Sequence, residues 1–238
     1  MTLQGRIAIV TGAGKGIGRA IAVALAREGV DVGLVARTRS DLDALAAELS
    51  ALGVRTSVAT ADVGRREDAE RAVAAIAAAL GPASILINNA GIAQFGTVLE
   101  MEPAAWERII QVNVLGTYYM TRAALPAMVA ANGGEIVNIA STAGQKGAAK
   151  LSAYAASKAA MLSFTESLAA EVRKHGVRVT ALLPSTVNTE LAASIGLPIG
   201  AEDRMMQPED VAELTIAALR LPARVFLRDA SILTTNPA

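Results

Sequence analysis

A tyrosine and a lysine four residues apart offer the clearest acid–base chemistry in this chain. Tyr154 and Lys158 begin and end the pentapeptide YAASK, and side chains with this spacing share one face of a helix. A tyrosine ordinarily titrates near ~10, and an ammonium beside it favours the phenolate and lowers the pKa. The pair can therefore donate a proton to a carbonyl oxygen or accept one from an alcohol. The alternative is a surface pair on an ordinary helix, and the rest of the chain has to decide between the two.

A hydroxyl lies upstream of this pair, at Ser141. It follows the apolar run 136–140, which is typical of a buried strand. Open α/β sheets bind ligands at the carboxyl ends of their strands, where we expect Ser141 to hold the same substrate oxygen as Tyr154.

A glycine-rich turn follows the first apolar run, residues 7–10, and a helical pattern follows the turn. Glycines let the backbone turn tightly and approach a pyrophosphate, which then lies at the helix N-terminus. The spacing is neither the strict G-x-G-x-x-G pattern nor a Walker A loop, because Gly16 follows Lys15. A turn without a ligand is the weaker interpretation, so we expect a dinucleotide to contact Gly12, Gly14, Lys15, Gly16, Ile17 and Gly18.

The end of the second expected strand, residues 32–36, indicates which dinucleotide is bound. An NAD site would place a carboxylate there for the ribose hydroxyls, but the sequence continues with Arg37, Thr38 and Arg39. Arg37, joined by Lys15, suits a 2′-phosphate. We therefore expect NADP (NADPH) rather than NAD; the alternative is that the arginines are solvated at a helix start.

Three polar positions follow other expected strands or interrupt a helix. Asp62 and Val63 follow the strand 54–60, where Asp62 accepts from adenine, caps the helix that begins near Arg65, or does both. The segment NNAG follows the strand 84–87, and its small residues let Asn89, Ala90 and Gly91 lie against a ligand. Its Asn side chains can also tie neighbouring strands together. Asn113 falls in the long helix expected over 106–128 and needs a partner there.

Strands alternate with helices along the whole chain, without a linker. Further strands are expected at 177–183 and 224–227, and a helix over 211–219 begins at Pro208. The pattern predicts an α/β fold, with residues 1–238 forming a single Rossmann-type domain: a doubly wound parallel sheet of about seven strands with helices on both faces. Residues 190–207 have weak periodicity and are expected to form a mobile lid over the site.

Composition excludes several other classes of protein. The formal net charge is zero with dispersed Lys and Arg, so we expect no nucleic-acid partner. The chain has no Cys and a single His, which argues against a metal site and against a Ser-His-Asp hydrolase. No segment is long and apolar enough to cross a bilayer, and the first residues resemble no signal peptide, so we expect a cytoplasmic protein.

These residues together resemble the classical short-chain dehydrogenase/reductase family, and most closely its 3-oxoacyl-[acyl-carrier-protein] reductase group. The resemblance rests on the glycine-rich turn, Asp62-Val63, the NNAG segment, Asn113, Ser141 and the YAASK segment, which occur in the family's order over almost the whole chain. It implies that Tyr154 is the general acid–base and that Lys158 lowers its pKa and holds the nicotinamide ribose. It also implies that Ser141 orients the carbonyl, that Asn113 holds a water, and that Pro184, Val187 and Thr189 flank the nicotinamide.

The chain departs from the family's pattern in two places. Ser185 stands where the family usually has Gly, which adds a side chain close to the nicotinamide. The last residues, ASILTTNPA, differ from the usual C-terminal strand and Gly-Gly turn that build the tetramer. Both departures bear on the substrate and on the subunit contacts.

The expected substrate site combines apolar side chains with amides. Besides Ser141 and Tyr154, we expect contacts from Gln94, Phe95, Gln145, Lys146 and the lid residues Leu191, Ile195 and Leu197. Such a pocket suits a ketone or a 3-oxoacyl thioester, possible substrates for an NADPH-dependent reductase in fatty acid biosynthesis, with an acyl carrier protein as a potential partner.

Two alternatives remain open at this stage. One is a dehydrogenase that oxidises a sugar, a steroid or a small alcohol, and the other is a nucleotide-binding protein without turnover. For either enzyme, the resemblance implies a homotetramer or a homodimer formed through the long helices around Asn113 and Tyr154.

Overall fold

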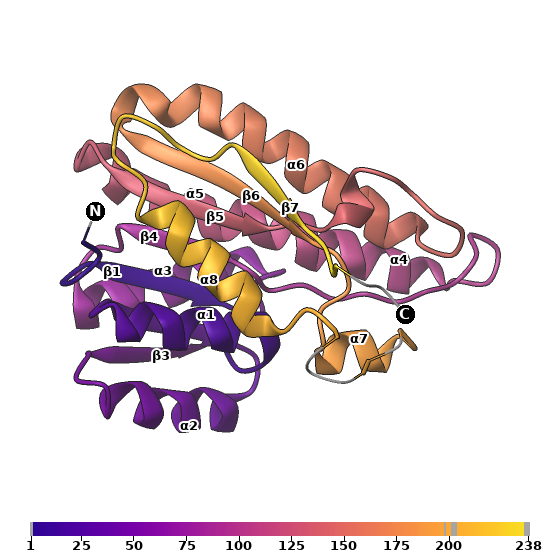
Figure 1. Ribbon diagram of the computed structural model, residues 1–238, viewed down its shortest axis with the longest axis horizontal. Helices are drawn as coiled ribbons and strands as arrows, with labels where there is room; N and C mark the ends of the chain where they lie inside the picture. Colours follow the sequence, from indigo (N-terminus) through magenta and orange to yellow (C-terminus); the bar gives the residue numbers. More distant parts are fainter. Residues whose placement is uncertain (1, 198, 201–203, 236–238) are drawn as a thin grey trace.

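A parallel sheet forms the centre of the molecule (Figure 1). Within the residues that the computed structural model describes (2–197, 199–200 and 204–235), the sheet has seven strands in the order β3-β2-β1-β4-β5-β6-β7. The strands are β1 (Ile7–Thr11), β2 (Asp31–Ala36), β3 (Thr56–Thr60), β4 (Ile85–Asn88), β5 (Gly134–Ile139), β6 (Val177–Pro184) and β7 (Asp229–Ile232). The order reverses between β1 and β4, so the expected doubly wound sheet is confirmed and its switch point lies there.

Alternating apolar side chains of the central strands build two cores, one on each face of the sheet. In β1, Ala8 and Val10 pack into one core while Ile9 packs into the other. The first core is covered by α1 (Gly16–Arg27), α2 (Arg39–Ser50) and α8 (Pro208–Leu219). The second is covered by α3 (Arg66–Leu80), α5 (Gly116–Ala130) and α6 (Ser152–Val172). A sheet covered on both faces explains why its strands are apolar at nearly every position.

The long helix expected over 106–128 is interrupted by one wide turn. The structure has α4 (Pro103–Ile110), a π-helical turn η1 (Gln111–Leu115) and then α5. Asn113 lies within this turn and is fully buried. A π-turn inside an α-helix often marks a functional position, and the apolar periodicity of the sequence does not reveal it.

Three short elements complete the described part of the chain, two of them after strands end and one just before β6 begins. The 3-10 turn η2 (Thr142–Gly144) follows β5, η3 (Arg173–His175) ends α6, and α7 (Glu190–Ser194) opens the segment expected to be a lid. Residues 198 and 201–203 of that segment and residues 236–238 of the C-terminal tail lie outside the described residues. No helix in the described part of the chain is long and apolar enough to span a membrane.

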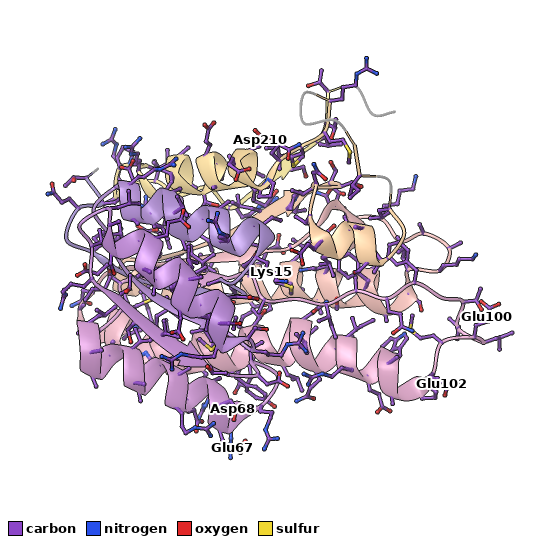
Figure 2. All side chains as sticks on the ribbon, turned by 90° about the horizontal axis from the view of Figure 1, so that it is seen from below. Lys15, Glu67, Asp68, Glu100, Glu102 and Asp210 are labelled. Carbon is purple, nitrogen blue, oxygen red and sulfur yellow. The ribbon has the colours of Figure 1, made fainter. Side chains whose placement is uncertain are left out.

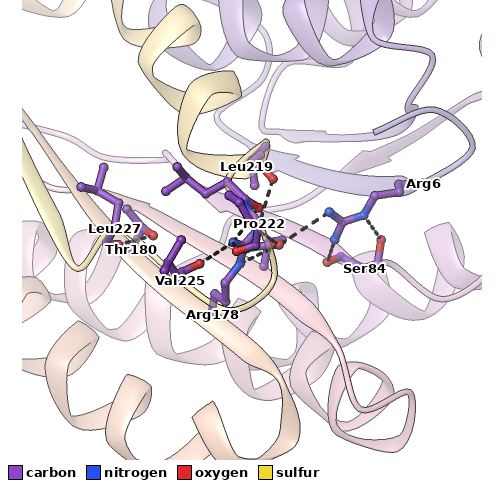
Figure 3. A network of polar contacts seen from close by, with 10 residues as sticks. Arg6, Ser84, Arg178, Thr180, Leu219, Pro222, Val225 and Leu227 are labelled. Atoms are coloured by element: carbon purple, nitrogen blue, oxygen red, sulfur yellow. Dashed lines mark hydrogen bonds and ion pairs between the residues drawn. The ribbon is translucent and has the colours of Figure 1, made fainter. Parts of the chain in front are cut away.

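The last strand lies farther along the chain than the sequence indicated. We expected it at 224–227, but β7 is Asp229–Ile232, and Ala181 pairs with Asp229 at its start. The buried Arg178 explains the difference (Figure 3). Its guanidinium donates to the carbonyl oxygens of Leu221, Pro222 and Val225 at 3.0, 3.2 and 2.7 Å, so this stretch wraps around an arginine instead of pairing with β6.

Arg178 also forms the buried ion pair at the amino end of the sheet. Its Nε lies 2.9 Å from Glu135 Oε2, and Nη2 donates to Glu135 Oε1. Burial raises the pKa of Glu135, while the hydrogen bond and charge of Arg178 act in the opposite direction. Arg6, in the chain just before β1, places its Nη1 3.7 Å from Glu135 Oε1 and donates from Nε to Ser84 Oγ. The cluster thus links the chain before β1, β5, β6 and the connection after α8.

We expect Arg178→Met to destabilise the protein strongly, because the variant leaves Glu135 buried without its bidentate partner. The loss in the free energy of unfolding should be about 3 kcal/mol, the low end for breaking a buried pair, since Arg6 remains nearby. Urea-induced unfolding at constant m-value measures it. Arg173→Met, at an exposed arginine, is the matched control.

The double variant Glu135→Leu/Arg178→Met separates the cost of the unpaired buried charge from the cost of the lost packing. It should recover part of the loss, because replacing both partners removes the unpaired buried carboxylate. A loss below about 0.5 kcal/mol in Arg178→Met, the range of an ordinary surface change, would contradict the role assigned to this pair.

Candidate active site

The turn between β1 and α1 is shaped for close approach to a ligand. Gly12 has a φ of +63°, a conformation that side chains rarely adopt. At Gly18, a Cβ would lie 2.3 Å from the Gly12 carbonyl oxygen and 2.4 Å from Asn89 Nδ2. No side chain fits at this second position. Gly18 therefore packs beneath the turn, and the outer surface of the turn is left to a ligand.

Two side chains join this turn to the one after β4. Thr11 Oγ1 donates to the Ile87 carbonyl and accepts from the backbone N–H groups of Asn89 and Ala90 at 2.9 and 3.0 Å. Asn89 Nδ2 in return donates to the Thr11 carbonyl at 3.0 Å. The two turns at the switch point of the sheet are therefore held together from both sides. Thr11 belongs to the family's motif, but its spacing alone did not assign it this role.

A cleft of about 480 Å³ opens over these turns. Most residues expected to hold the dinucleotide line it: Gly12, Gly14, Lys15, Gly16, Ile17, Arg37, Asp62, Val63, Asn89, Ala90, Gly91 and Thr189. Ala61, Ile92 and Val112 add apolar surface. The chain thus brings six separate segments to one site, as expected of the crevice at a switch point.

The cations that line this cleft differ in whether they already form an ion pair with a carboxylate. Lys15, which is labelled in Figure 2, donates from Nζ to Glu190 at 3.0 Å, and that hydrogen bond raises the pKa of Lys15. Arg108 pairs with Asp62. Arg37 is exposed and has no ion-pair partner among residues 2–197, 199–200 and 204–235. Arg37 is therefore the cation most available to an anion bound in this cleft.

Asp62 does not cap the helix that follows it. Its Oδ1 accepts from the Gly64 N–H at 3.0 Å, and α3 begins after Arg65 without a side-chain cap. The ion pair with Arg108 explains the difference, because it draws the carboxylate toward α4 and away from the first turn of α3. Of the two roles considered, only the adenine contact remains as a prediction.

A second cavity, of about 640 Å³, contains the expected catalytic groups. Ser141, Tyr154 and Lys158 line it together with Pro184, Ser185, Val187 and Thr189. The two cavities adjoin, because both are lined by Ile17, Asn89, Gly91, Thr189 and Leu191. A ligand extending along the first cavity would reach the hydroxyls of the second. The apolar residues expected there also line this cavity: Phe95, Leu191, Ile195 and Leu197.

Ser141 is fixed by its position at the start of η2. Its Oγ accepts from the Ala143 N–H at 3.2 Å and lies 3.4 Å from the Pro184 carbonyl. Burial raises the pKa of Tyr154, and a hydrogen bond with Ser141 opposes that rise. Serine and tyrosine hydroxyls therefore face the same point in the cavity.

Lys158 lies behind Tyr154 and is 4% exposed. Its Nζ donates to the Ile139 carbonyl at 2.8 Å and lies 5.7 Å from the centre of the Tyr154 ring. Burial lowers the pKa of Lys158 to about 8. The expected lowering of the Tyr154 pKa is wrong for these contacts, because desolvation dominates and the ammonium is bonded to Ile139. Tyr154 therefore holds its proton at neutral pH.

Asn113 does not line either cavity but supports the second one from behind. Its side chain donates to Ser157 Oγ at 3.0 Å and exchanges two hydrogen bonds with the backbone of Ile92. Ser157 Oγ donates in turn to the Tyr154 carbonyl at 2.7 Å. Asn113 thus connects α6 to the segment after β4. Ser157 was not among the expected site residues, although it lies three positions after Tyr154 on the same helix.

The two glutamines expected at the substrate lie elsewhere. Gln94 and Gln145 are exposed and line neither cavity. Ala93 and Phe95, on either side of Gln94, line the cavity in its place. Gln145 is instead bonded to Ser231, whose Oγ donates to Gln145 Oε1 at 3.4 Å. Lys150 and Leu151 line the cavity and were not anticipated.

The fold and the paired cavities define a doubly wound α/β protein with a dinucleotide-type cleft at its switch point. The short chain dehydrogenase family model matches residues 6–198, so the chain belongs to that family and is an oxidoreductase. An uncharacterized oxidoreductase of Staphylococcus saprophyticus is 38% identical over 233 residues, which cover 97% of each chain.

Two solved structures extend this likeness to three dimensions. A variant of actinorhodin polyketide ketoreductase with NADPH superposes with a TM-score of 0.88 at 33% identity, covering 96% of each chain. The 3-ketoacyl-(acyl-carrier-protein) reductase of Brucella melitensis, complexed with NADH, also has a TM-score of 0.88, at 31% identity, covering 97% of this chain and 98% of that chain.

The lowered pKa of Lys158 predicts a pH-dependent contribution to stability. Between pH 8 and 10.5, the unfolded lysine holds a proton that the folded one has lost, so stability rises with pH across this window. The free energy of unfolding of the wild type, relative to Lys158→Met, should increase on the order of 3 kcal/mol from pH 7 to 10.5. Urea unfolding at a series of pH values measures the difference. An unchanged difference would mean that Lys158 has an ordinary pKa.

Proposed function

We propose that the protein is an NADPH-dependent reductase that converts a ketone to a secondary alcohol, with 3-oxoacyl thioesters as the substrate class. One observation carries the proposal: Ser141, Tyr154 and Lys158 line a single cavity that adjoins the glycine-rich cleft. A carbonyl placed between the two hydroxyls lies within reach of a nicotinamide that extends from that cleft.

The residues present fit a dinucleotide. The turn of Gly12 to Gly18 leaves backbone N–H groups at the start of α1 for the pyrophosphate, and a Cβ at Gly18 would collide with the backbone that forms this cradle. Arg37 at the end of β2 suits the 2′-phosphate, so NADP(H) is the cofactor. When bound, the nicotinamide supplies the hydride for the carbonyl carbon. Pro184, Val187 and Thr189 lie where they would flank its ring.

Proton transfer is the task of this chain's own side chains. Ser141 orients the carbonyl oxygen, and Tyr154 donates the proton to it as negative charge develops there. Because burial keeps Tyr154 protonated at neutral pH, the site is prepared for reduction. Lys158, charged below its pKa of about 8, stabilises the tyrosinate that forms and holds the nicotinamide ribose. Asn113 positions the helix that carries Tyr154, through its bonds to Ile92 and Ser157, and its expected contact with a water remains a prediction.

The substrate class follows from the lining of the cavity. Phe95, Leu151, Leu191, Ile195 and Leu197 offer an apolar wall beside the hydroxyls, which suits an acyl chain more than a sugar. The names of the two similar solved structures, a polyketide ketoreductase and a 3-ketoacyl-(acyl-carrier-protein) reductase, favour the same class. An acyl carrier protein as the partner and a homo-oligomer as the assembly remain predictions.

Replacing Tyr154 by Phe tests the chemistry. We expect the variant to lose at least about 10²-fold in the rate of NADPH-dependent reduction, because the general acid is removed, while NADPH affinity stays nearly unchanged. The initial rate of NADPH loss with an acetoacetyl thioester and with a simple diketone measures turnover, and fluorescence titration measures binding. Tyr118→Phe, on an exposed tyrosine of α5, is the control.

The two substrates distinguish the reaction from the substrate class. Turnover of the diketone alone would keep the reductase chemistry and discard the thioester. Wild-type activity in Tyr154→Phe would remove Tyr154 from its role. NADPH binding without turnover of any ketone or alcohol would favour a nucleotide-binding protein.

Cofactor choice is tested at Arg37. Arg37→Asp should lower kcat/KM for NADPH by on the order of 10² relative to NADH, because it replaces a phosphate-binding charge with one that repels phosphate. Arg39→Asp is the matched control, since Arg39 pairs with Asp43 and does not line the cleft. If the two variants change the NADPH/NADH ratio equally, the 2′-phosphate does not contact Arg37.

A further inference from the structure

The charged residues around the catalytic cavity are all of one sign. Among the described residues, those that line it include Lys146, Lys150 and Lys158 and no Asp or Glu. Lys158 is buried beside Tyr154 and bonded to the Ile139 carbonyl. Lys146 and Lys150 are exposed, so they contribute positive charge to the mouth of the cavity, where the catalytic groups do not use it.

Neither rim lysine is neutralised by a carboxylate in the described part of the chain. Glu190, which lies between the lining residues Thr189 and Leu191, is bonded to Lys15. Glu100 accepts from the Thr97 hydroxyl at 2.8 Å, and Figure 2 shows Glu100 and Glu102 at the outer end of the segment leading into α4. The two ammonium groups are available to an anion that enters from solvent.

The backbone at Lys150 is strained and fixed. Its φ is +66°, in the left-handed region that residues other than glycine rarely adopt. The Gly96 N–H donates to the Lys150 carbonyl at 3.0 Å, which ties this loop to the segment after β4. Residues held in such conformations cluster at ligand sites. The strain is therefore consistent with a lysine held at a set place on the rim.

The lining residues differ in kind and in exposure, from the buried or half-buried hydroxyls to the exposed lysines. Ser141 and Tyr154 mark the reacting end, Leu151 and the lid's Leu191 and Ile195 line an apolar part, and the lysines lie at the exposed rim. A ligand matching this sequence has a carbonyl, then an uncharged stretch, and then an anion. Lysine binds phosphate as a point charge, without the fixed fork that arginine offers to a planar carboxylate.

We propose that Lys146 and Lys150 are specificity-determining residues that bind the phosphate of the carrier arm of an acyl thioester. The inference rests on the proposed reduction of 3-oxoacyl thioesters and names the part of the substrate that this rim recognises. The shared chemistry is a phosphate separated from the thioester by a neutral arm, as in coenzyme A and in the phosphopantetheine group of a carrier protein. Because the lysines are exposed, their effect on binding should be moderate and sensitive to salt.

The test compares thioesters with and without phosphate. With NADPH saturating, kcat/KM is measured for acetoacetyl-coenzyme A, acetoacetyl-phosphopantetheine and neutral acetoacetyl-N-acetylcysteamine. In Lys146→Gln/Lys150→Gln, the ratio of kcat/KM for the coenzyme A ester to that for the neutral ester should fall on the order of 10-fold, mainly through KM. Lys174→Gln, at an exposed lysine that does not line the cavity, should leave the ratio unchanged.

The three esters also separate the sources of the phosphate. An equal effect with phosphopantetheine and coenzyme A esters assigns the contact to the phosphate that both share. An effect with coenzyme A alone overturns the proposal, because it assigns the contact to the nucleotide end of that carrier and not to the phosphate of the arm. A ratio that does not change in the double variant, or that changes as much in Lys174→Gln, overturns the proposal even if all three esters are reduced.

Binding without turnover keeps the rim proposal separate from the proposed reaction. Calorimetric titration of the NADPH-loaded protein with free coenzyme A and with neutral pantetheine requires no chemistry. Tighter binding of coenzyme A that is lost in the double variant supports the rim site even where no ester is reduced, an outcome that refutes the proposed reduction of thioesters alone. Equal affinity for the two ligands in the wild type overturns the rim site.

Discussion

The close approach of the turn after β1 to the turn after β4 is the constraint on which the whole site depends. Gly18 is packed so tightly between the Gly12 carbonyl and the Asn89 side chain that a single added carbon has no space. Thr11 and Asn89 then hold the two turns together by hydrogen bonds in both directions. Because the two cavities share lining residues from these turns, any separation of β1 from β4 would break the continuity between the cofactor cleft and the catalytic hydroxyls.

A second set of buried polar contacts holds α6, the helix that carries Tyr154 and Lys158, against the sheet beside that cleft. Asn88 Nδ2 donates to Asn138 Oδ1 at 2.8 Å, and Asn138 Nδ2 donates to Thr165 of α6 at 2.8 Å. Lys158 adds a bond to the end of β5. Each such bond contributes on the order of 1 kcal/mol but leaves a costly unpaired group if it is broken. The inner face of α6 is thus fixed in register by directional contacts, where apolar packing alone would tolerate sliding.

The sequence was sufficient for the features that depend on local pattern. Alternating apolar strands and helices predicted the sheet, and the glycine spacing and the YAASK segment identified the residues that line the two cavities. The sequence was insufficient where a residue far away in the chain determines the local structure. Arg178, on β6, captures the carbonyls that follow α8 and displaces the last strand, and Arg108 draws Asp62 away from α3. Gln94 and Gln145 are residue types that suit a substrate contact. The direction of a loop side chain is set by backbone angles, however, and composition does not specify them; the positive φ of Lys150 is an example.

Burial reverses the simplest expectation from the spacing of Tyr154 and Lys158, and the reversal has a chemical meaning. Taking both groups out of water disfavours the phenolate and the ammonium alike, so the pKa of the tyrosine rises while that of the lysine falls to about 8. At neutral pH this leaves a protonated phenol beside a cation, which is the state needed to give a proton to a carbonyl oxygen. Among the described residues that line the joined cavities, the exposed cations without an ion pair are Arg37 in one cavity and Lys146 and Lys150 in the other. The hydroxyls of Ser141 and Tyr154 suit a neutral carbonyl, and in the proposed reaction the anions of cofactor and substrate would fix its position through these cations.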